Sequence, residues 1–295
     1  MEGEFAEGNF LGLPTPKGDP DVIIASIPYE LTTSYGQGTA KGPSACIEAS
    51  GQVELYDDLL NQELPAGANI LTTKEWSGEG NTLQEQLDSI GRYAAKQYDT
   101  GAFPIFLGGE HGMLPGILRG CPEKVTLIQI DAHADLRDEL DGEPYSHACA
   151  ISRSLDEGAL GVYQIGIRAY CKQEAEYISN DERVNTWFAK DILNPSTAQE
   201  SWSDWLDKIS QIKGPVHLTI DIDGLDGTLV PATGTPVPGG LTFWHVVQTI
   251  ETAFSKCDII SADVNEIVPQ NDTPLTQFTA AMIATKIIAA QINRG

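Results

Sequence analysis

Short apolar runs recur along the chain and alternate with longer amphipathic stretches. The apolar runs have the length of β-strands and are mostly bounded by Gly, Pro or Asp; they span residues 21–27, 102–107, 125–130, 162–167, 216–222 and 258–264. Three stretches carry apolar side chains at helical spacing instead: residues 82–98, 201–212 and 244–256. The pattern therefore predicts strands in the first set and helices in the second.

The order and polarity of these segments predict the fold class. Strands that are apolar almost throughout are typical of a sheet covered on both faces, as parallel sheets are. Strands that alternate with helices favour an α/β fold, in which a mainly parallel sheet carries helices on either side. No internal repeat, low-complexity tract or linker divides the sequence, so we expect residues 1–295 to form a single domain.

The charge of the chain limits the classes of molecule that it is expected to bind. It has 42 acidic and 18 basic residues, and its formal net charge is -24. Such an acidic surface disfavours nucleic acid and anionic membranes as partners, and it favours a small cationic ligand. An acidic surface also keeps a protein in solution, and the charge alone does not separate these two explanations.

Cysteine usage and hydropathy predict the cellular compartment. The cysteines are odd in number, widely separated and free of C-x-x-C spacing: Cys46, Cys121, Cys149, Cys171 and Cys257. This argues against a disulfide framework and against a structural zinc site, and it favours a reducing cytoplasm. The first ten residues, "MEGEFAEGNF", lack the features of a signal peptide, and we expect no stretch of about 18 apolar residues that would span a bilayer.

Titratable residues gather where the predicted strands end. In parallel sheets, ligands bind just beyond the carboxyl ends of the strands. Alternation through "HLTIDID" places His217, Thr219, Asp221 and Asp223 on one face of a strand, so two carboxylates project together. The candidate metal ligands at three strand ends are His111, Asp131, His133, Asp135, Asp221 and Asp223.

This set of side chains indicates a metal centre. Carboxylates that lie together at the end of a buried strand repel one another unless a proton or a cation sits between them. Two imidazoles and four carboxylates are too many ligands for one small ion, whereas two ions that share bridging carboxylates would use them all. The oxygen-rich set suits Mn²⁺ best, with Zn²⁺ or Ni²⁺ as alternatives. Two such ions make hydroxide available near neutral pH, so hydrolysis is the implied chemistry.

Each cluster has a plainer explanation when it is taken by itself. An Asp at a strand end often caps a helix, and a single His often packs in a core. We expect His217 to lie in the core or behind the ligands, and His245 to be structural. Cys149, close to His147, is expected to be a small buried thiol rather than a nucleophile.

Four motifs together resemble the ureohydrolases, the family of arginases and agmatinases. They are "GGEHG" (108–112), "DAHADLRD" (131–138), "DIDGLDGTLVPATGTPVPGGLT" (221–242) and "DVNEIVPQND" (263–272), in the family's order and approximate spacing. The resemblance covers most of the chain. It implies a three-layer α/β/α fold with a largely parallel sheet, a dinuclear manganese centre, and release of urea from a guanidino substrate by a homo-trimer or hexamer.

The resemblance also implies roles for individual residues. It assigns one ion to His111, Asp131, Asp135 and Asp221, and the other ion to Asp131, His133, Asp221 and Asp223. Hydroxide would attack the guanidinium carbon, and Asp135 would carry a proton toward the departing amine. His147 matches the family's proton-shuttle histidine, and Glu266 matches the carboxylate that holds the guanidinium. From the residues alone, His147 could equally be a surface histidine and Glu266 could pair within its own loop.

The loop after the DAHAD segment bears on the substrate. Its acidic side chains would repel the α-carboxylate of arginine and attract an ammonium group: Asp138, Glu139, Asp141 and Glu143. Agmatine lacks that carboxylate, so we expect hydrolysis of agmatine to putrescine and urea. This loop and residues 27–50 also resemble microbial agmatinases more than arginases. Arg137 could instead grip an anionic tail such as that of guanidinobutyrate, or pair with a neighbouring carboxylate.

Other functions stay open at this point. Another ureohydrolase would act on guanidinobutyrate, guanidinopropionate, arginine or guanidine. A zinc deacetylase of related fold is disfavoured by the six-ligand set, and a non-catalytic metal-stabilised protein is disfavoured by the presence of His147 and Glu266. Gly227 and Ala232 depart from the family pattern, where proline and glycine are usual, and leave the shape of their loop open.

Overall fold

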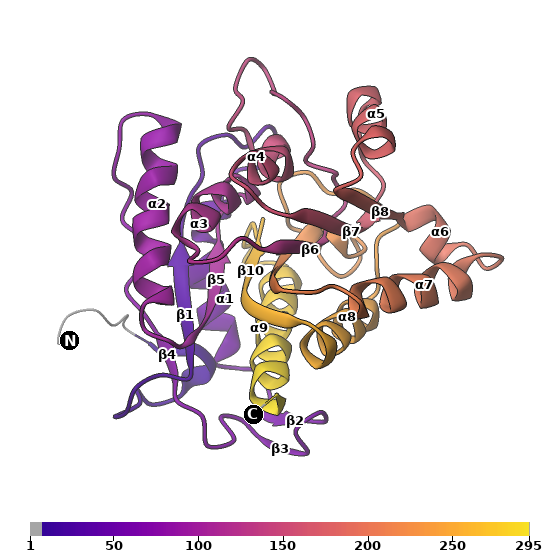
Figure 1. Ribbon diagram of the computed structural model, residues 1–295. Helices are drawn as coiled ribbons and strands as arrows, with labels where there is room; N and C mark the ends of the chain where they lie inside the picture. Colours follow the sequence, from indigo (N-terminus) through magenta and orange to yellow (C-terminus); the bar gives the residue numbers. More distant parts are fainter. Residues whose placement is uncertain (1–7, 295) are drawn as a thin grey trace.

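One eight-stranded sheet runs through the centre of the molecule (Figure 1). In this computed structural model, which describes residues 8–294, the strand order is β4-β1-β5-β10-β9-β6-β7-β8 and every pairing is parallel. The strands are β1 (Val22–Ile27), β4 (Ile70–Thr72), β5 (Phe103–Gly108), β6 (Thr126–Ile130), β7 (Gly161–Ile167), β8 (Val184–Phe188), β9 (Pro215–Asp221) and β10 (Asp258–Asn265). The six predicted strands are all present, each within one residue of its predicted ends.

Helices cover both faces of this sheet and complete three layers (Figure 1). Their bounds are α1 (Gly42–Ser50), α2 (Leu83–Tyr98), α3 (Leu114–Gly120), α4 (Ala150–Asp156), α5 (Lys172–Asn180), α6 (Ala189–Leu193), α7 (Ala198–Ser210), α8 (Phe243–Lys256) and α9 (Leu275–Asn293). A core cluster on one face joins the sheet to α1 and to α6 through α9, and two clusters on the other face join it to α2 through α5. The predicted α/β/α fold is therefore confirmed.

Two of the predicted helices begin at side-chain caps. At α2, the Thr82 hydroxyl accepts a hydrogen bond from the Glu85 N–H, and the Glu85 carboxylate accepts one from the Thr82 N–H. At α8, Thr242 and His245 make the same reciprocal pair, with the imidazole Nδ1 as the acceptor. These bonds satisfy N–H groups that a helix leaves free at its start. The structural role expected of His245 is this cap.

Helix α9 corrects the expectation that no apolar stretch of the chain is long enough to span a bilayer. Residues Leu275–Ile292 have a mean hydropathy of 1.2 and are long and apolar enough to cross a membrane by length and composition. Within the fold, 67% of this window is buried. The helix packs against α1, α8 and the sheet, with Ile283, Ile287 and Ile288 fully covered. Its apolar character therefore reflects a place in the core of this domain. The N-terminal residues 1–7, part of the segment tested for a signal peptide, lie outside the described residues.

Strand β9 divides its side chains between the two faces as its alternation predicts. Leu218 and Ile220 belong to the core cluster beside α7, α8 and α9, whereas His217 and Thr219 face the opposite layer. The strand ends at Asp221, one residue before its predicted end, so Asp223 does not belong to it. Asp223 lies in the short 3₁₀ helix η5 (Ile222–Gly224), and its N–H donates to the Asp221 carboxylate over 2.9 Å.

Candidate metal centre and substrate cleft

Backbone turns after three strands of the same part of the sheet bring the candidate ligands together. His111 opens the 3₁₀ helix η3 (His111–Met113) after β5, Asp131 follows β6, and Asp221 ends β9. The turn after β5 requires glycine, because a Cβ at Gly109 would collide with the carbonyl oxygen of Tyr29. β5, β10, β9 and β6 are consecutive neighbours in the sheet, so segments far apart in the sequence meet at one edge.

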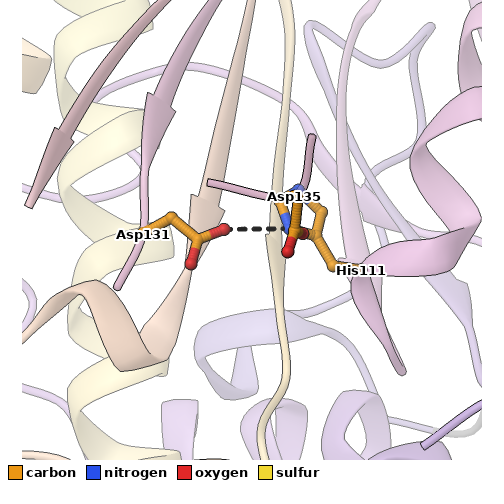
Figure 2. Close-up of side chains that lie close together, drawn as sticks. All are labelled: His111, Asp131 and Asp135. Atoms are coloured by element: carbon orange, nitrogen blue, oxygen red, sulfur yellow. Dashed lines mark ion pairs between the residues drawn. The ribbon is translucent and has the colours of Figure 1, made fainter. Parts of the chain in front are cut away.

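The first group of ligands is fully enclosed. The imidazole Nδ1 of His111 lies 3.1 Å from Asp131 Oδ2 and 3.0 Å from Asp135 Oδ2. Figure 2 shows the Asp131 carboxylate pointing at the His111 ring, with Asp135 overlapping the ring in this view. The ligand atoms lie within 4.8 Å of one another, which is close enough to share one ion. Asp221 Oδ2 is 3.8 Å from the same His111 nitrogen and lies at the edge of this group.

The second group of ligands shares Asp131 with the first. The His133 Nδ1 lies 3.0 Å from Asp223 Oδ2 and 3.7 Å from Asp131 Oδ1. These ligand atoms also lie within 4.8 Å of one another. All six predicted ligands therefore lie in one cluster, and Asp131 joins its two halves as a bridging carboxylate would.

The chemistry of this cluster fits divalent cations. Burial raises the pKa of Asp221, and neighbouring carboxylates raise it further; burial also raises the pKa of Asp223, against the opposing charge of His133. Burial and then the charge of Asp131 raise the pKa of Asp135 to about 6. The imidazole Nδ1 of His111 is buried and makes no hydrogen bond within the described residues. Buried carboxylates that crowd one ring nitrogen are the donors that a metal ion would satisfy.

A row of polar side chains crosses the sheet behind the ligands, in register on five strands: Thr186, Gln164, Gln129, Thr219 and Asp263. Gln129 Nε2 donates to Asp131 Oδ2 over 2.8 Å, and its carbonyl accepts from Gln164 over 2.7 Å. The Thr219 hydroxyl lies 2.9 Å from His111 Nε2 and donates to Asp263. These bonds orient the ligands from behind.

His217 belongs to the same buried network. Its Nε2 lies 2.7 Å from Asp263 Oδ2 and its Nδ1 lies 2.7 Å from the Ser261 hydroxyl. The expectation that His217 lies in the core or behind the ligands is therefore confirmed. We did not predict a role for Gln129, Gln164 or Asp263 from the sequence. The alternation of side chains along the strands is the signal that could have pointed to them.

Glu266 and His147 meet beside the cluster. Glu266 Oε1 accepts a hydrogen bond from the His111 N–H over 2.8 Å and lies 3.5 Å from the His147 Nδ1. Burial lowers the pKa of His147, but Glu266, Asp135 and Glu110 together raise it to about 9. The Nε2 atom of His147 is buried and has no hydrogen-bond partner within the described residues. His147 is therefore not an ordinary surface histidine.

Two non-glycine residues of this region hold a left-handed backbone conformation. The φ angle is +53° at Asp135 and +59° at Glu266. Such conformations are disfavoured for residues with a Cβ, and they persist where the surrounding structure over-determines them. At Asp135, the carbonyl oxygen accepts from the N–H groups of Ile151 and Ser152, which fix the turn.

Glu110, to which the sequence analysis gave no role, holds the backbone segments beside His147 in place. It is fully buried, and its carboxylate accepts from the N–H groups of Leu31 and Thr32 and from the Thr32 hydroxyl. That hydroxyl in turn accepts from the His147 N–H over 2.9 Å. Burial and then Glu266 raise the pKa of Glu110 to about 7. Glu110 therefore ties the loop after β1 to the segment that carries His147.

A cleft of about 550 Å³ opens onto the cluster. Five of the predicted site residues line it: His133, Asp135, His147, Asp221 and Glu266. The lining also includes Arg137, Asp141, Tyr170 and Glu174, together with Thr235 from the loop after η5. The cleft thus connects the candidate metal ligands to solvent through the loop that the sequence analysis linked to substrate choice.

Three further residues named in the sequence analysis, Cys149, Ala232 and Gly227, lie outside the cluster of candidate ligands. Cys149 is fully buried, and burial raises the pKa of its thiol to about 12, as suits a packed thiol and not a nucleophile. Ala232, one of the two departures from the family pattern, is buried, and its N–H donates to the Thr276 hydroxyl. A Cβ at Gly227 would meet no atom within 4 Å, so nothing in the fold requires glycine there.

Comparison with known proteins identifies the family. The model of the arginase family matches residues 20–290. The chain belongs to the arginase family. It is 33% identical over 287 residues to the N(1)-aminopropylagmatine ureohydrolase of Synechocystis sp., an alignment that covers 93% of this chain and 90% of the relative. It is 34% identical over 260 residues to the agmatinase of Bacillus anthracis, covering 86% of each chain.

Solved structures agree with this placement. The agmatine ureohydrolase of Thermoplasma volcanium superposes with a TM-score of 0.82 at 26% identity, over 98% of this chain and 96% of that one. The proclavaminate amidino hydrolase of Streptomyces clavuligerus shares the fold, with a TM-score of 0.85 at 22% identity over 98% of each chain. This arginase-family chain is thus a ureohydrolase related to agmatinases, a metal-dependent hydrolase of guanidino C–N bonds.

Proposed function

We propose that this ureohydrolase binds two Mn²⁺ ions and hydrolyses agmatine to putrescine and urea. The observation that carries the substrate assignment is the charge of the cleft lining. Apart from the predicted site residues, this lining holds Asp141 and Glu174 against one cation, Arg137. An acidic wall favours an ammonium tail over a carboxylate tail.

The position of Arg137 supports a cationic substrate. Its Nε lies 3.8 Å from the carboxylate of Glu174, which is buried. That carboxylate also accepts hydrogen bonds from the N–H groups of Leu136 and Cys171, so it is fixed in place. Glu174 therefore offsets the charge of Arg137, as one of the two sequence-based hypotheses for Arg137 expected. Asp141 remains to attract the ammonium group of agmatine.

Six residues would hold the two ions: His111, Asp131, His133, Asp135, Asp221 and Asp223. Four carboxylates and two imidazoles suit Mn²⁺ better than ions that prefer thiolates. Two bound ions would lower the pKa of water from near 15.7 to about 7 and so supply hydroxide at neutral pH.

The protein's own groups would orient the substrate and move protons. Glu266 would accept paired hydrogen bonds from the planar guanidinium, and the His111 N–H holds one of its oxygens in place. Asp135, whose pKa is raised to about 6, would pass a proton to the departing amine. His147, with one ring nitrogen free and the other facing Glu266, would carry protons between this site and solvent.

A panel of guanidino compounds tests the assignment. The Mn²⁺-loaded protein would be assayed for urea release from agmatine, arginine, guanidinobutyrate, guanidinopropionate and guanidine, with Asp131→Asn as the inactive control. We expect urea from agmatine above all others. Preference for a carboxylate-bearing substrate would refute the reasoning from Asp141 and Glu174. No urea from any compound, with Ni²⁺ and Zn²⁺ also tried, would refute the proposed activity.

The relatives favour a second candidate, N(1)-aminopropylagmatine. Proteins at 33% and 34% identity carry the two names N(1)-aminopropylagmatine ureohydrolase and agmatinase, so identity does not separate them. Both compounds offer a guanidino end and a cationic tail, which the same acidic wall would accept. A comparison of kcat/KM for the two compounds decides between them, and we expect agmatine to be preferred.

The proposal extends to the oligomeric state of the protein and to its place in the cell. We propose a homo-trimer or hexamer in the cytoplasm, on the family resemblance and the thiol content. A mass measured in solution at one subunit would refute the first part.

A further inference from the structure

One arginine gathers backbone carbonyls from three segments next to the metal centre. Arg168 follows β7, and its guanidinium donates to six carbonyl oxygens: those of Gly166, Asp223, Gly224, Leu225, Val237 and Pro238. The shortest of these bonds run to Val237, at 2.6 Å, and to Asp223, at 2.7 Å. Within residues 8–294, no carboxylate lies at ion-pair distance from Arg168, so its donors serve the backbone alone.

The shape of the guanidinium explains why arginine occupies this position. Its five N–H groups form a rigid planar fork that can bridge several acceptors at once, whereas the ammonium of lysine is a single point. Three of the acceptors belong to consecutive residues, Asp223 to Leu225, at the end of η5. Carbonyls at the end of a helical turn lack partners within the helix and carry partial negative charge, so a cation is favoured there.

These carbonyls belong to segments that build the site. Asp223 offers its carbonyl to Arg168, while its carboxylate faces His133 at 3.0 Å and accepts from the Ala132 N–H. Val237 follows Thr235, which lines the cleft, by two residues. A single side chain therefore holds a candidate ligand and part of the cleft wall in a fixed relation.

The backbones around Arg168 pack without side chains between them. A Cβ at Gly224 would lie 2.7 Å from the backbone nitrogen of Asp131, and a Cβ at Gly166 would lie 2.8 Å from its backbone carbonyl oxygen. Gly166 also has a φ of +94°, which favours glycine. These close contacts place η5 directly against the backbone of Asp131, so Arg168 can bond to η5 only with the carbonyl groups that face away from that contact.

We propose that Arg168 is a positioning residue that keeps Asp223 in place to bind the ion shared with His133, and that keeps residues 226–240 in place to close the cleft. This inference rests on the proposed dinuclear centre, but its first readout is metal binding, which needs no substrate.

Two substitutions that keep a donor but lose the fork test it: Arg168→Lys and Arg168→Gln. Metal-free protein would be titrated with Mn²⁺ by calorimetry. We expect the affinity for one of the two ions to fall by about 10- to 100-fold, as for other residues that support metal ligands, while the other ion binds normally. In a urea assay with the substrate that the wild type prefers, KM should also rise.

Two further variants sharpen the result. Arg294→Lys is the matched control, because Arg294 also donates to backbone carbonyls, those of Ile259 and Cys257, at the amino end of β10 and away from the cluster; both ions should bind normally. Asp226→Ala removes the acceptor for the N–H groups of Gly239 and Gly240 and for the N–H and hydroxyl of Thr228, so it should raise KM and leave both ions bound.

Several outcomes would overturn the proposal. Normal binding of both ions and a normal KM in the Arg168 variants, with only a lower Tm, would reduce Arg168 to a general stabilising role. Failure of both variants to fold with saturating Mn²⁺ would lead to the same conclusion. A wild type that binds two ions but releases no urea would refute the proposed activity, and the binding result would still decide the role of Arg168.

Discussion

The two halves of the candidate metal cluster differ in the exposure of their histidines and in what holds them. In the inner half, the side chains of His111, Asp131 and Asp135 are at most 8% exposed. In the outer half, Asp223 is as deeply buried, but the side chain of His133 is 27% exposed. The inner half is braced by side chains of the sheet, whereas the outer half is braced by backbone groups around η5.

This difference shows that strands position one half of the candidate centre and loops position the other. Strand register fixes the inner half, because Thr219 and Gln129 sit on neighbouring strands and bond to His111 and Asp131. Loops fix the outer half, since Asp223 depends on a 3₁₀ turn and on Arg168. We therefore expect the inner ion to bind more tightly and the outer ion to respond more to changes in the loops.

The largest effect is expected at the residue that both halves share. Asp131→Asn should abolish binding of both ions and lower urea release by about 10³-fold or more, because water is no longer brought from a pKa near 15.7 toward 7. Elemental analysis and the urea assay check this. A variant that retained either ion at wild-type affinity would show that the halves do not depend on Asp131 in common.

Removing one imidazole at a time separates the halves. An ion at 100 times its Kd stabilises a protein by about 2.7 kcal/mol, so each bound ion should raise Tm. His111→Ala should remove most of the stabilisation by Mn²⁺, whereas His133→Ala should keep the part due to the inner ion. Thermal unfolding with and without Mn²⁺ measures both. Equal losses in the two variants would contradict the ranking of the halves.

A smaller effect is expected behind the inner half. Thr219→Val keeps the shape of the side chain but removes the hydroxyl between His111 and Asp263, and it should weaken the inner ion by about 10- to 100-fold. Thr186→Val is the matched control, since Thr186 lies at the far end of the same polar row and bonds only to Gln164. The inference fails if both substitutions weaken the ion equally.

The smallest effect concerns the stability of the metal-free protein. Burial and Asp131 raise the pKa of Asp135 from 3.8 to about 6. A raised pKa stabilises the fold below the unfolded value, and this stability is lost as the pH rises through the folded value. The free energy of unfolding should therefore fall between pH 4 and 6, by about 1–3 kcal/mol more in the wild type than in Asp135→Asn. Urea titrations at each pH test this, and parallel curves for the two proteins would contradict it.

The sequence predicted the central strands because their burial leaves a clear record. Strands such as residues 102–107 are covered on both faces, so nearly every position is apolar. The edge strands were missed for the opposite reason. β8, "VNTWF", is only partly buried and mixes polar with aromatic residues, and β4 is three residues long. Helix α9 was missed because it is buried on most sides, so its apolar residues form no stripe.

The candidate site was predicted to the extent that it follows strands. His111, Asp131 and Asp221 come directly at strand ends, and the parallel arrangement places those ends together. Supporting residues could not be found in this way. Arg168 follows a strand as well, but its partners are backbone carbonyls, which every residue carries. Their convergence depends on how three loops fold together, and a sequence pattern does not show it.

A count of bound ions tests the central claim most directly. Metal-free wild type, His133→Ala and His111→Ala would be titrated with Mn²⁺ by calorimetry, and the bound metal would be confirmed by elemental analysis. We expect two ions of unequal affinity per chain in the wild type, one tight ion in His133→Ala, and no tight ion in His111→Ala. A single ion in the wild type, or a tight ion that survives in His111→Ala but not in His133→Ala, would contradict the account.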